Sequence, residues 1–172
     1  MTRRPLWISL AALSLVAVVA VAKEAKTPSA ATIGKPMPKW SATTLEAATA
    51  DANKKALAAG RASTVTGEVV DVSCYLQMGK RGEAHVACGT KCITNGQPIG
   101  LVDASGNLYL LFAEEHHPRR DGQVTLKDAF LPLLAKQVTV NGMVTQLRGG
   151  ARALFVEASD LSSMMKTEDG QK

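Results

Sequence analysis

The chain has 172 residues, of which 46% are hydrophobic and 20% charged, and these fractions are ordinary for a globular protein. Its formal net charge is +5, but the basic residues are scattered in short clusters such as Lys54-Lys55 and Arg119-Arg120. A nucleic-acid-binding protein needs a continuous basic face, so this pattern excludes that class.

The first 22 residues have the pattern of an export signal. Arg3 and Arg4 are followed by an uncharged apolar run and by Ala20-Val21-Ala22, a small-x-small cleavage site. We therefore predict a signal peptide over residues 1–22 and a periplasmic or secreted mature chain. The apolar run is nearly long enough to span a bilayer, so an uncleaved segment would tether the chain to a membrane.

Two segments precede the main domain. Residues 23–40 contain several prolines and lysines and no periodic apolar pattern, which predicts an extended, mobile linker. Residues 41–62 are rich in alanine, with Leu45 and Leu57 near helical spacing and Gly60 as a stop signal. This second segment is predicted to be one helix that lies against the domain.

The main domain spans residues 63–160 and is predicted to be mainly β, because five segments are rich in β-branched and apolar residues. These segments are residues 64–73, 97–102, 107–112, 136–147 and 151–158. Residues 125–135 have helical spacing interrupted by Pro132, which predicts a short helix between the third and fourth strands. Residues 161–172 are polar and are predicted to form a flexible tail.

Five strands with a helix between the third and fourth is the order of the OB-fold, a small barrel. A V-x-G-x-V pattern puts Gly67 and Gly142 in the middle of the two long strands, where barrel strands bend. The chain from Ala129 onward, with K-Q-V-T-V-N-G-M-V and R-A-L-F-V-E-A-S, also resembles the last helix and strands of secreted bacterial OB-fold domains. We therefore expect a five-stranded OB-fold-like barrel with a short Cys/His-bearing helix after its first strand.

All three cysteines lie in one stretch, from Cys74 to Cys92, together with His85. If residues 84 to 94 form a helix, His85, Cys88 and Cys92 fall within about 60° of one another on one face. Cys74 would reach the same place from the end of the preceding strand. Three sulfur atoms and one imidazole form a four-ligand set that suits a soft metal ion, either Zn²⁺ or Cu(I).

The spacing Cys88-x-x-x-Cys92 is similar to the copper ligands of Sco-type copper chaperones and of the dicopper centre of cytochrome oxidase. In those families a histidine comes from elsewhere in the chain, whereas His85 here lies three residues upstream of Cys88. The resemblance implies copper as the bound ion. Met78 is a further soft group that could supply an axial contact.

Two other interpretations of the cysteines stay open. An exported chain meets an oxidising environment, where Cys74 could form a disulfide with Cys88 or with Cys92 and leave one thiol free. A bridge between Cys88 and Cys92 within one helix is geometrically poor. In the other interpretation, the thiols and His85 are buried without a ligand. The metal site is favoured because it explains why His85 shares a face with two of the cysteines.

The rest of the chain offers little catalytic chemistry. His116-His117, flanked by Glu114 and Glu115, could form a second site, but an exposed loop is favoured. No G-x-S-x-G, Walker, H-E-x-x-H or C-x-x-C motif is present, so nothing in the sequence supports an enzyme. The sequence predicts an exported soft-metal-binding protein with a structural, metal-handling or electron-transfer role and a protein partner in the cell envelope. The alternative is a disulfide-stapled binding or scaffold module without a metal.

Overall fold

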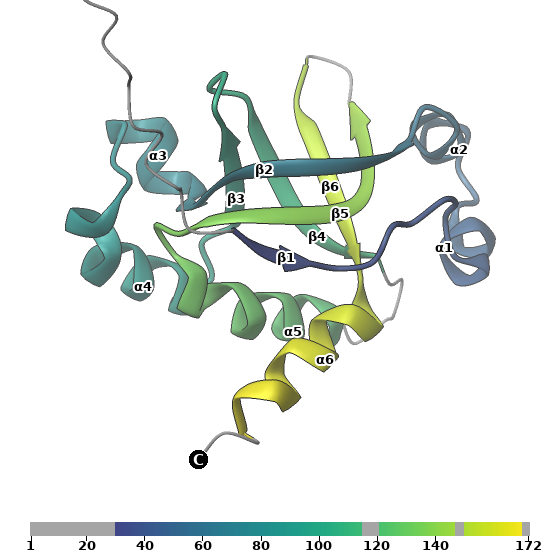
Figure 1. Ribbon diagram of the computed structural model, residues 1–172. Helices are drawn as coiled ribbons and strands as arrows, with labels where there is room; N and C mark the ends of the chain where they lie inside the picture. The colour runs from purple at the N-terminus through teal and green to yellow at the C-terminus, as the bar shows by residue number, and fades with distance from the viewer. Residues whose placement is uncertain (1–29, 115–120, 147–149, 170–172) are drawn as a thin grey trace, which may run out of the picture.

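Five β-strands close into a barrel, and a sixth strand adds to its side (Figure 1). The computed structural model describes residues 30–114, 121–146 and 150–169. Its strands are β1 (Ala31–Ile33), β2 (Arg61–Asp71), β3 (Ile99–Asp103), β4 (Leu108–Glu114), β5 (Gln137–Gln146) and β6 (Arg152–Glu157). Around the ring the order is β2-β3-β4-β6-β5, and β5 returns to β2. The prediction of a mainly β chain that forms a barrel is confirmed.

The helices lie around the barrel in three places (Figure 1). They are α1 (Ala42–Ala47), α2 (Asp51–Ala58), α3 (Val72–Met78), η1 (Glu83–His85, a 3₁₀ turn), α4 (Val86–Thr94), α5 (Asp121–Phe130), η2 (Leu131–Leu133, a 3₁₀ turn) and α6 (Ala158–Asp169). The pair α3 and α4 lies on the opposite side from α1 and α2, while α5 and α6 lie below the barrel. Within the described ranges, no helix has the length and apolar character needed to cross a bilayer.

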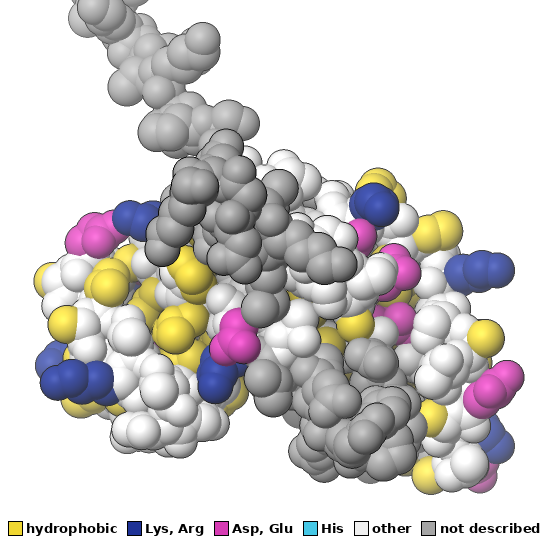
Figure 2. All heavy atoms as spheres, turned by 90° about the horizontal axis from the view of Figure 1, so that it is seen from below, with side chains coloured by type: hydrophobic (Ala, Val, Ile, Leu, Met, Phe, Trp, Pro, Cys, Tyr) yellow, Lys and Arg dark blue, Asp and Glu magenta, His cyan; other side chains and the backbone are white. Residues whose placement is uncertain are grey.

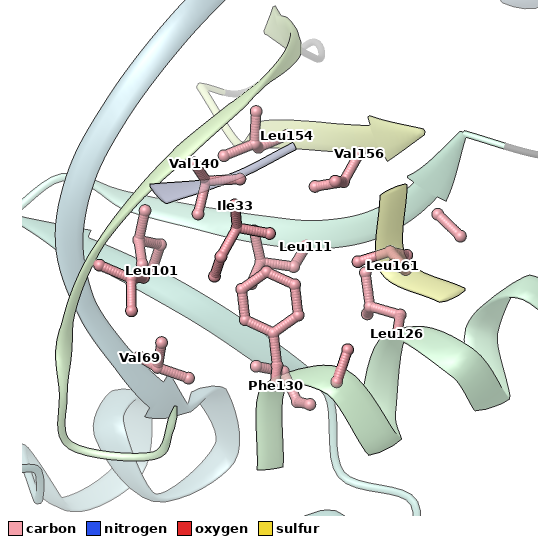
Figure 3. Close-up of a cluster of buried hydrophobic side chains, with 14 of the residues drawn as sticks. Ile33, Val69, Leu101, Leu111, Leu126, Phe130, Val140, Leu154, Val156 and Leu161 are labelled. Carbon is pink, nitrogen blue, oxygen red and sulfur yellow. The ribbon is translucent and has the colours of Figure 1, made fainter. Parts of the chain in front are cut away.

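The barrel is filled by one apolar cluster that joins the strands to α5 and α6. Phe130, at the end of α5, is fully buried, and its ring points toward Ile33 and Leu111 (Figure 3). The helix stops there because Pro132, which follows within η2, cannot donate the next backbone hydrogen bond. The break expected at Pro132 is therefore observed.

The two glycines of the V-x-G-x-V pattern lie where neighbouring strands approach closely. A Cβ atom on Gly67 would lie 2.5 Å from the carbonyl oxygen of Val102, and one on Gly142 would collide with the carbonyl oxygen of Phe155. Both contacts are with backbone, which cannot rotate away as a side chain can. Glycine at these positions therefore permits the barrel to close.

The segment expected to be a linker, residues 23–40, is ordered from its first described residue. Strand β1 pairs in parallel with the first half of β5, and the backbone N–H of Lys35 donates to the Asp160 carboxylate over 2.6 Å. Trp40 is 6% exposed and donates its ring N–H to the Leu57 carbonyl. The linker prediction was wrong here because three strand residues, held by distant partners, leave no periodic signal in the sequence.

Two other boundaries differ from the expected ones. The single helix predicted over residues 41–62 is two helices, α1 and α2, separated by a break at 48–50. The tail predicted over residues 161–172 is helical as far as Asp169, and Leu161 is fully buried against the core. A single apolar anchor in a polar segment is enough to dock the start of α6. The predicted signal peptide and His116-His117 lie outside the described residues.

Charged side chains of both signs are interspersed on the face seen from below the barrel (Figure 2). Hydrophobic side chains lie among them, and no continuous basic stripe crosses the visible described surface.

Replacing Gly142 with alanine tests whether close strand approach limits the barrel. We expect Gly142→Ala to lower the free energy of unfolding by about 1–3 kcal/mol, because the methyl group meets a carbonyl oxygen of β6. Urea unfolding measures this. The control is Gln137→Ala, an exposed position on the same strand, β5, which should change stability by less than about 0.5 kcal/mol. Equal stability of both variants would show that the strands have room to separate.

Candidate metal centre

The centre begins where β2 ends. Asp71 adopts an extended backbone, and its carboxylate accepts hydrogen bonds from the backbone N–H groups of Ser73 (3.0 Å) and Cys74 (3.4 Å). An aspartate in this position caps a helix, so the chain turns from β2 directly into α3. Cys74 thus lies in the first turn of α3 and is 6% exposed. The expected placement of Cys74 at the end of a longer strand was wrong because the cap starts the helix two residues earlier.

The loop after α3 brings the chain back toward the barrel. Helix α3 ends at Gly79, which has φ of 64°, a conformation that glycine adopts without strain. The backbone N–H of Gly82 donates to the Glu68 carboxylate over 2.7 Å, and the Arg81 guanidinium lies 3.8 Å from the same carboxylate. Glu68, on β2, therefore holds the loop that leads into the second half of the centre.

The second half comes from η1 and α4. His85 ends η1 and is 6% exposed, whereas Cys88 and Cys92 lie in α4, exposed and half-buried respectively. The one helix expected over residues 84 to 94 is thus divided at His85. Gly89 lets α4 pack closely against Leu134, because a Cβ atom there would lie 2.9 Å from the Leu134 Cδ2 atom, while the His85 ring beside it would be in ordinary contact at 3.4 Å.

The predicted ligands converge around Cys74. One group consists of Cys74, His85 and Cys88, and a second consists of Asp71, Cys74 and Cys92; within each group the ligand atoms lie within 4.8 Å of one another. The Sγ atoms of Cys74 and Cys92 are 3.9 Å apart. Cys74 therefore meets His85 and Cys88 in one group and Cys92 in the other, and each group is placed so that it can hold a metal ion.

Asp71 is a member of the centre that sequence reasoning missed. Its side chain is fully buried, and its Oδ2 atom lies 3.8 Å from the Nε2 atom of His85, too far for a hydrogen bond. Among the described residues, these two atoms are the buried side-chain polar atoms without a hydrogen-bond partner. The sequence did contain a signal for it: an aspartate, a residue type that often caps helices, stands three positions before Cys74. The segment around it otherwise has strand character.

The pKa values of two thiols in the centre, Cys74 and Cys92, are raised when no metal is bound. The Asp71 carboxylate beside the Cys74 thiol favours its protonated form, and together with burial this raises the pKa of Cys74 from 9.0 to about 12. Burial is the main cause that raises the pKa of Cys92. Coordination as thiolates at neutral pH must therefore release protons to solvent.

Met78, the further soft group considered from the sequence, lies at the exposed end of α3. Its side chain is 54% exposed and that of Leu76 is 66% exposed. Both stand on the helix that carries Cys74; Met78, four residues after Cys74, is on the same side of α3, whereas Leu76 is not.

A scan against protein-family models, a search of curated proteins and a search of solved structures each gave no match to this chain.

The raised pKa of Cys74 predicts how the stability of the metal-free protein depends on pH. The unfolded chain loses this thiol proton near its ordinary pKa of 9.0, and the folded chain loses it only near 12. Unfolding in this window releases a proton, so the free energy of unfolding should fall as pH rises. Urea unfolding with a chelator present, from about pH 8 to about pH 11, measures the slope.

The control is Cys74→Ser, because a serine at position 74 does not titrate in that range. Its free energy of unfolding should fall less steeply, because the other titrating groups are common to both proteins. Parallel pH profiles for the two proteins would contradict the assignment.

Proposed function

We propose that this chain is an exported soft-metal-binding protein whose centre holds copper or zinc through Cys74, His85, Cys88 and Cys92. The observation that carries the proposal is that these side chains, from α3, η1 and α4, form two ligand groups that share Cys74, beside buried polar atoms that lack partners. A bound cation would give those atoms the partner that the folded protein does not supply.

The geometry and chemistry of the ligands support a soft ion. Two thiolates bound to one tetrahedral ion at about 2.3 Å are about 3.8 Å apart. The 3.9 Å between the Sγ atoms of Cys74 and Cys92 is close to this value. Sulfur and imidazole ligands favour Zn²⁺ and Cu(I) over Mg²⁺ or Ca²⁺, which prefer oxygen.

The gradient of burial across the centre favours metal handling over a purely structural role. Cys74 and His85 are buried, whereas Cys88 is exposed to solvent. Structural zinc sites are closed by four protein ligands, and an exposed ligand is the one most easily exchanged for that of another molecule. A centre open at Cys88 can take up an ion from solvent or from a partner and release it again.

We also infer that the barrel is an OB-fold. The support is the ring order β2-β3-β4-β6-β5. Along the chain, α5 lies between β4 and β5, which are the third and fourth barrel strands in sequence. The centre would then be an insertion between the first two barrel strands. The N-terminal sequence pattern supports export, and a partner in the cell envelope that supplies or accepts the ion follows from this proposal.

A disulfide-stapled module without a metal is the second candidate, and it too has one observation in its favour. The Sγ atoms of Cys74 and Cys92 are 3.9 Å apart, so a small shift would bring them to bonding distance. Cys88 would then be the one free thiol.

Elemental analysis together with thiol titration separates the two candidates. The mature protein is purified without reductant from its exported form. The metal-binding function predicts copper or zinc bound to the chain and three thiols that react only after denaturation and chelation. No metal and one reactive thiol would establish the disulfide module instead.

Removing the imidazole should weaken metal binding sharply. We expect His85→Ala to lower the affinity for Zn²⁺ or Cu(I) by more than about 100-fold, because residues that only support metal ligands already contribute up to about that much. Competition with a chromophoric chelator measures the affinity. The matched control is Lys91→Ala, an exposed position on α4, which should bind as tightly as the parent protein. Unchanged affinity in His85→Ala would remove His85 from the centre.

Removing the charge of Asp71 while keeping its capping ability isolates its electrostatic role. Asparagine caps helices as well as aspartate does, so Asp71→Asn should keep α3 and its circular dichroism spectrum. We expect its metal affinity to fall by about 10–100-fold, because a carboxylate beside the ligands stabilises the bound cation. Equal affinity in the two proteins would reduce Asp71 to a helix cap.

A further inference from the structure

The ligand atoms of the centre form two sets rather than one. The sets of three described above have only Cys74 in common, so Cys88 and Cys92 belong to different sets. His85 and Cys88 complete the first set, and Asp71 and Cys92 complete the second. A centre built for one ion would place its ligands in a single group.

We propose that the centre binds two thiophilic cations, with the Cys74 thiolate as the bridge between them. This inference rests on the proposed metal-binding function and states how many ions the centre holds. One cation is held by Cys74, His85 and Cys88, and the other by Asp71, Cys74 and Cys92. A thiolate sulfur has three lone pairs, so it can bind two soft cations at once.

A second observation points to a cation at the place where the two sets meet. The first set contains His85, whose Nε2 atom is buried without a partner, and the second contains Asp71, whose Oδ2 atom is in the same state. The two atoms lie 3.8 Å apart and their side chains are 7% and 0% exposed, so water does not reach them freely. Unpartnered buried polar atoms are rare and costly, and here one occurs in each set. A cation in either set would give its own side chain a partner.

The charge of the ligands also favours more than one cation. Once the thiols are deprotonated, the three thiolates and the Asp71 carboxylate carry four negative charges, of which those on Asp71 and Cys74 are buried. One divalent ion would leave half of this charge uncompensated, and one monovalent ion would leave more. Uncompensated charge in a protein interior is strongly unfavourable, so a second cation stabilises the same set of ligands.

Each set supplies three ligands, which leaves coordination positions for groups from outside the chain. On the first side such a position lies next to the exposed Cys88. The cation held by His85 and Cys88 is therefore the exchangeable one, and the cation beside the buried Asp71 is the retained one.

Native mass spectrometry of the mature protein, titrated with Zn²⁺ and, under anaerobic reducing conditions, with Cu(I), counts the bound ions directly. We expect two ions per chain with at least one of these probes. Cys88→Ser disrupts the first set and Cys92→Ser disrupts the second, so each variant should retain one ion. Cys74→Ser removes the bridge and should retain none at stoichiometric loading. The Lys91→Ala variant on the same helix should bind two ions.

The Cys88→Ser and Cys92→Ser variants decide the question, because Cys88 is exposed and Cys92 only half-buried, so both variants are expected to fold. Circular dichroism checks their folding. Further support would be a difference in dissociation rate: the ion left in Cys92→Ser should transfer to a chelator at least about tenfold faster than the ion left in Cys88→Ser.

One ion in the parent protein, lost equally in all three cysteine variants, would establish a single-ion centre. That result overturns the two-ion inference and leaves the proposed metal-binding function in place. No bound ion with either probe would overturn both.

Discussion

The candidate metal centre depends on the position of the Asp71 carboxylate at the end of β2. One of its oxygen atoms caps α3, which ends β2 and fixes where Cys74 lies; the other faces His85 without a hydrogen bond. The same group keeps the Cys74 thiol protonated while no cation is present. A buried carboxylate with an unused oxygen is costly, and under the proposed function a cation between Asp71 and the cysteines would remove that cost.

The barrel could be predicted from the sequence because its strands are long and locally patterned. Alternating β-branched residues mark β2 and β5, and Gly67 and Gly142 mark where those strands approach their neighbours. Strand β1 could not be predicted, because three residues are too few to show a repeating pattern. Its position depends on pairing with the distant strand β5, and the neighbouring Lys35 is held by Asp160. Docking of α6 through Leu161 is a tertiary effect of the same kind.

The centre could be predicted in part for a related reason. The clustering of Cys74, His85, Cys88 and Cys92 is visible because the residues are close in sequence and their chemistry is distinctive. Their division into two sets could not be predicted, since it depends on the break between η1 and α4 and on the turn from β2 into α3. Asp71 was missed because carboxylates are common and its capping role conflicts with the strand character around it.

The N-terminal segment has a consequence for how the molecule is assembled. Contacts that hold β1 and the residues after it span nearly the whole domain: Gly34 is bound by Asn141, 107 residues away, and Lys35 by Asp160, 125 residues away. Loop closure over such separations is slow and is compensated only when both partners are already ordered. Strand β1 can dock only where β5 and α6 are already in place, since its segment is held by residues of those elements. The five barrel strands close without β1, and the candidate metal centre uses only residues 71 to 92, so neither depends on β1 for its contacts.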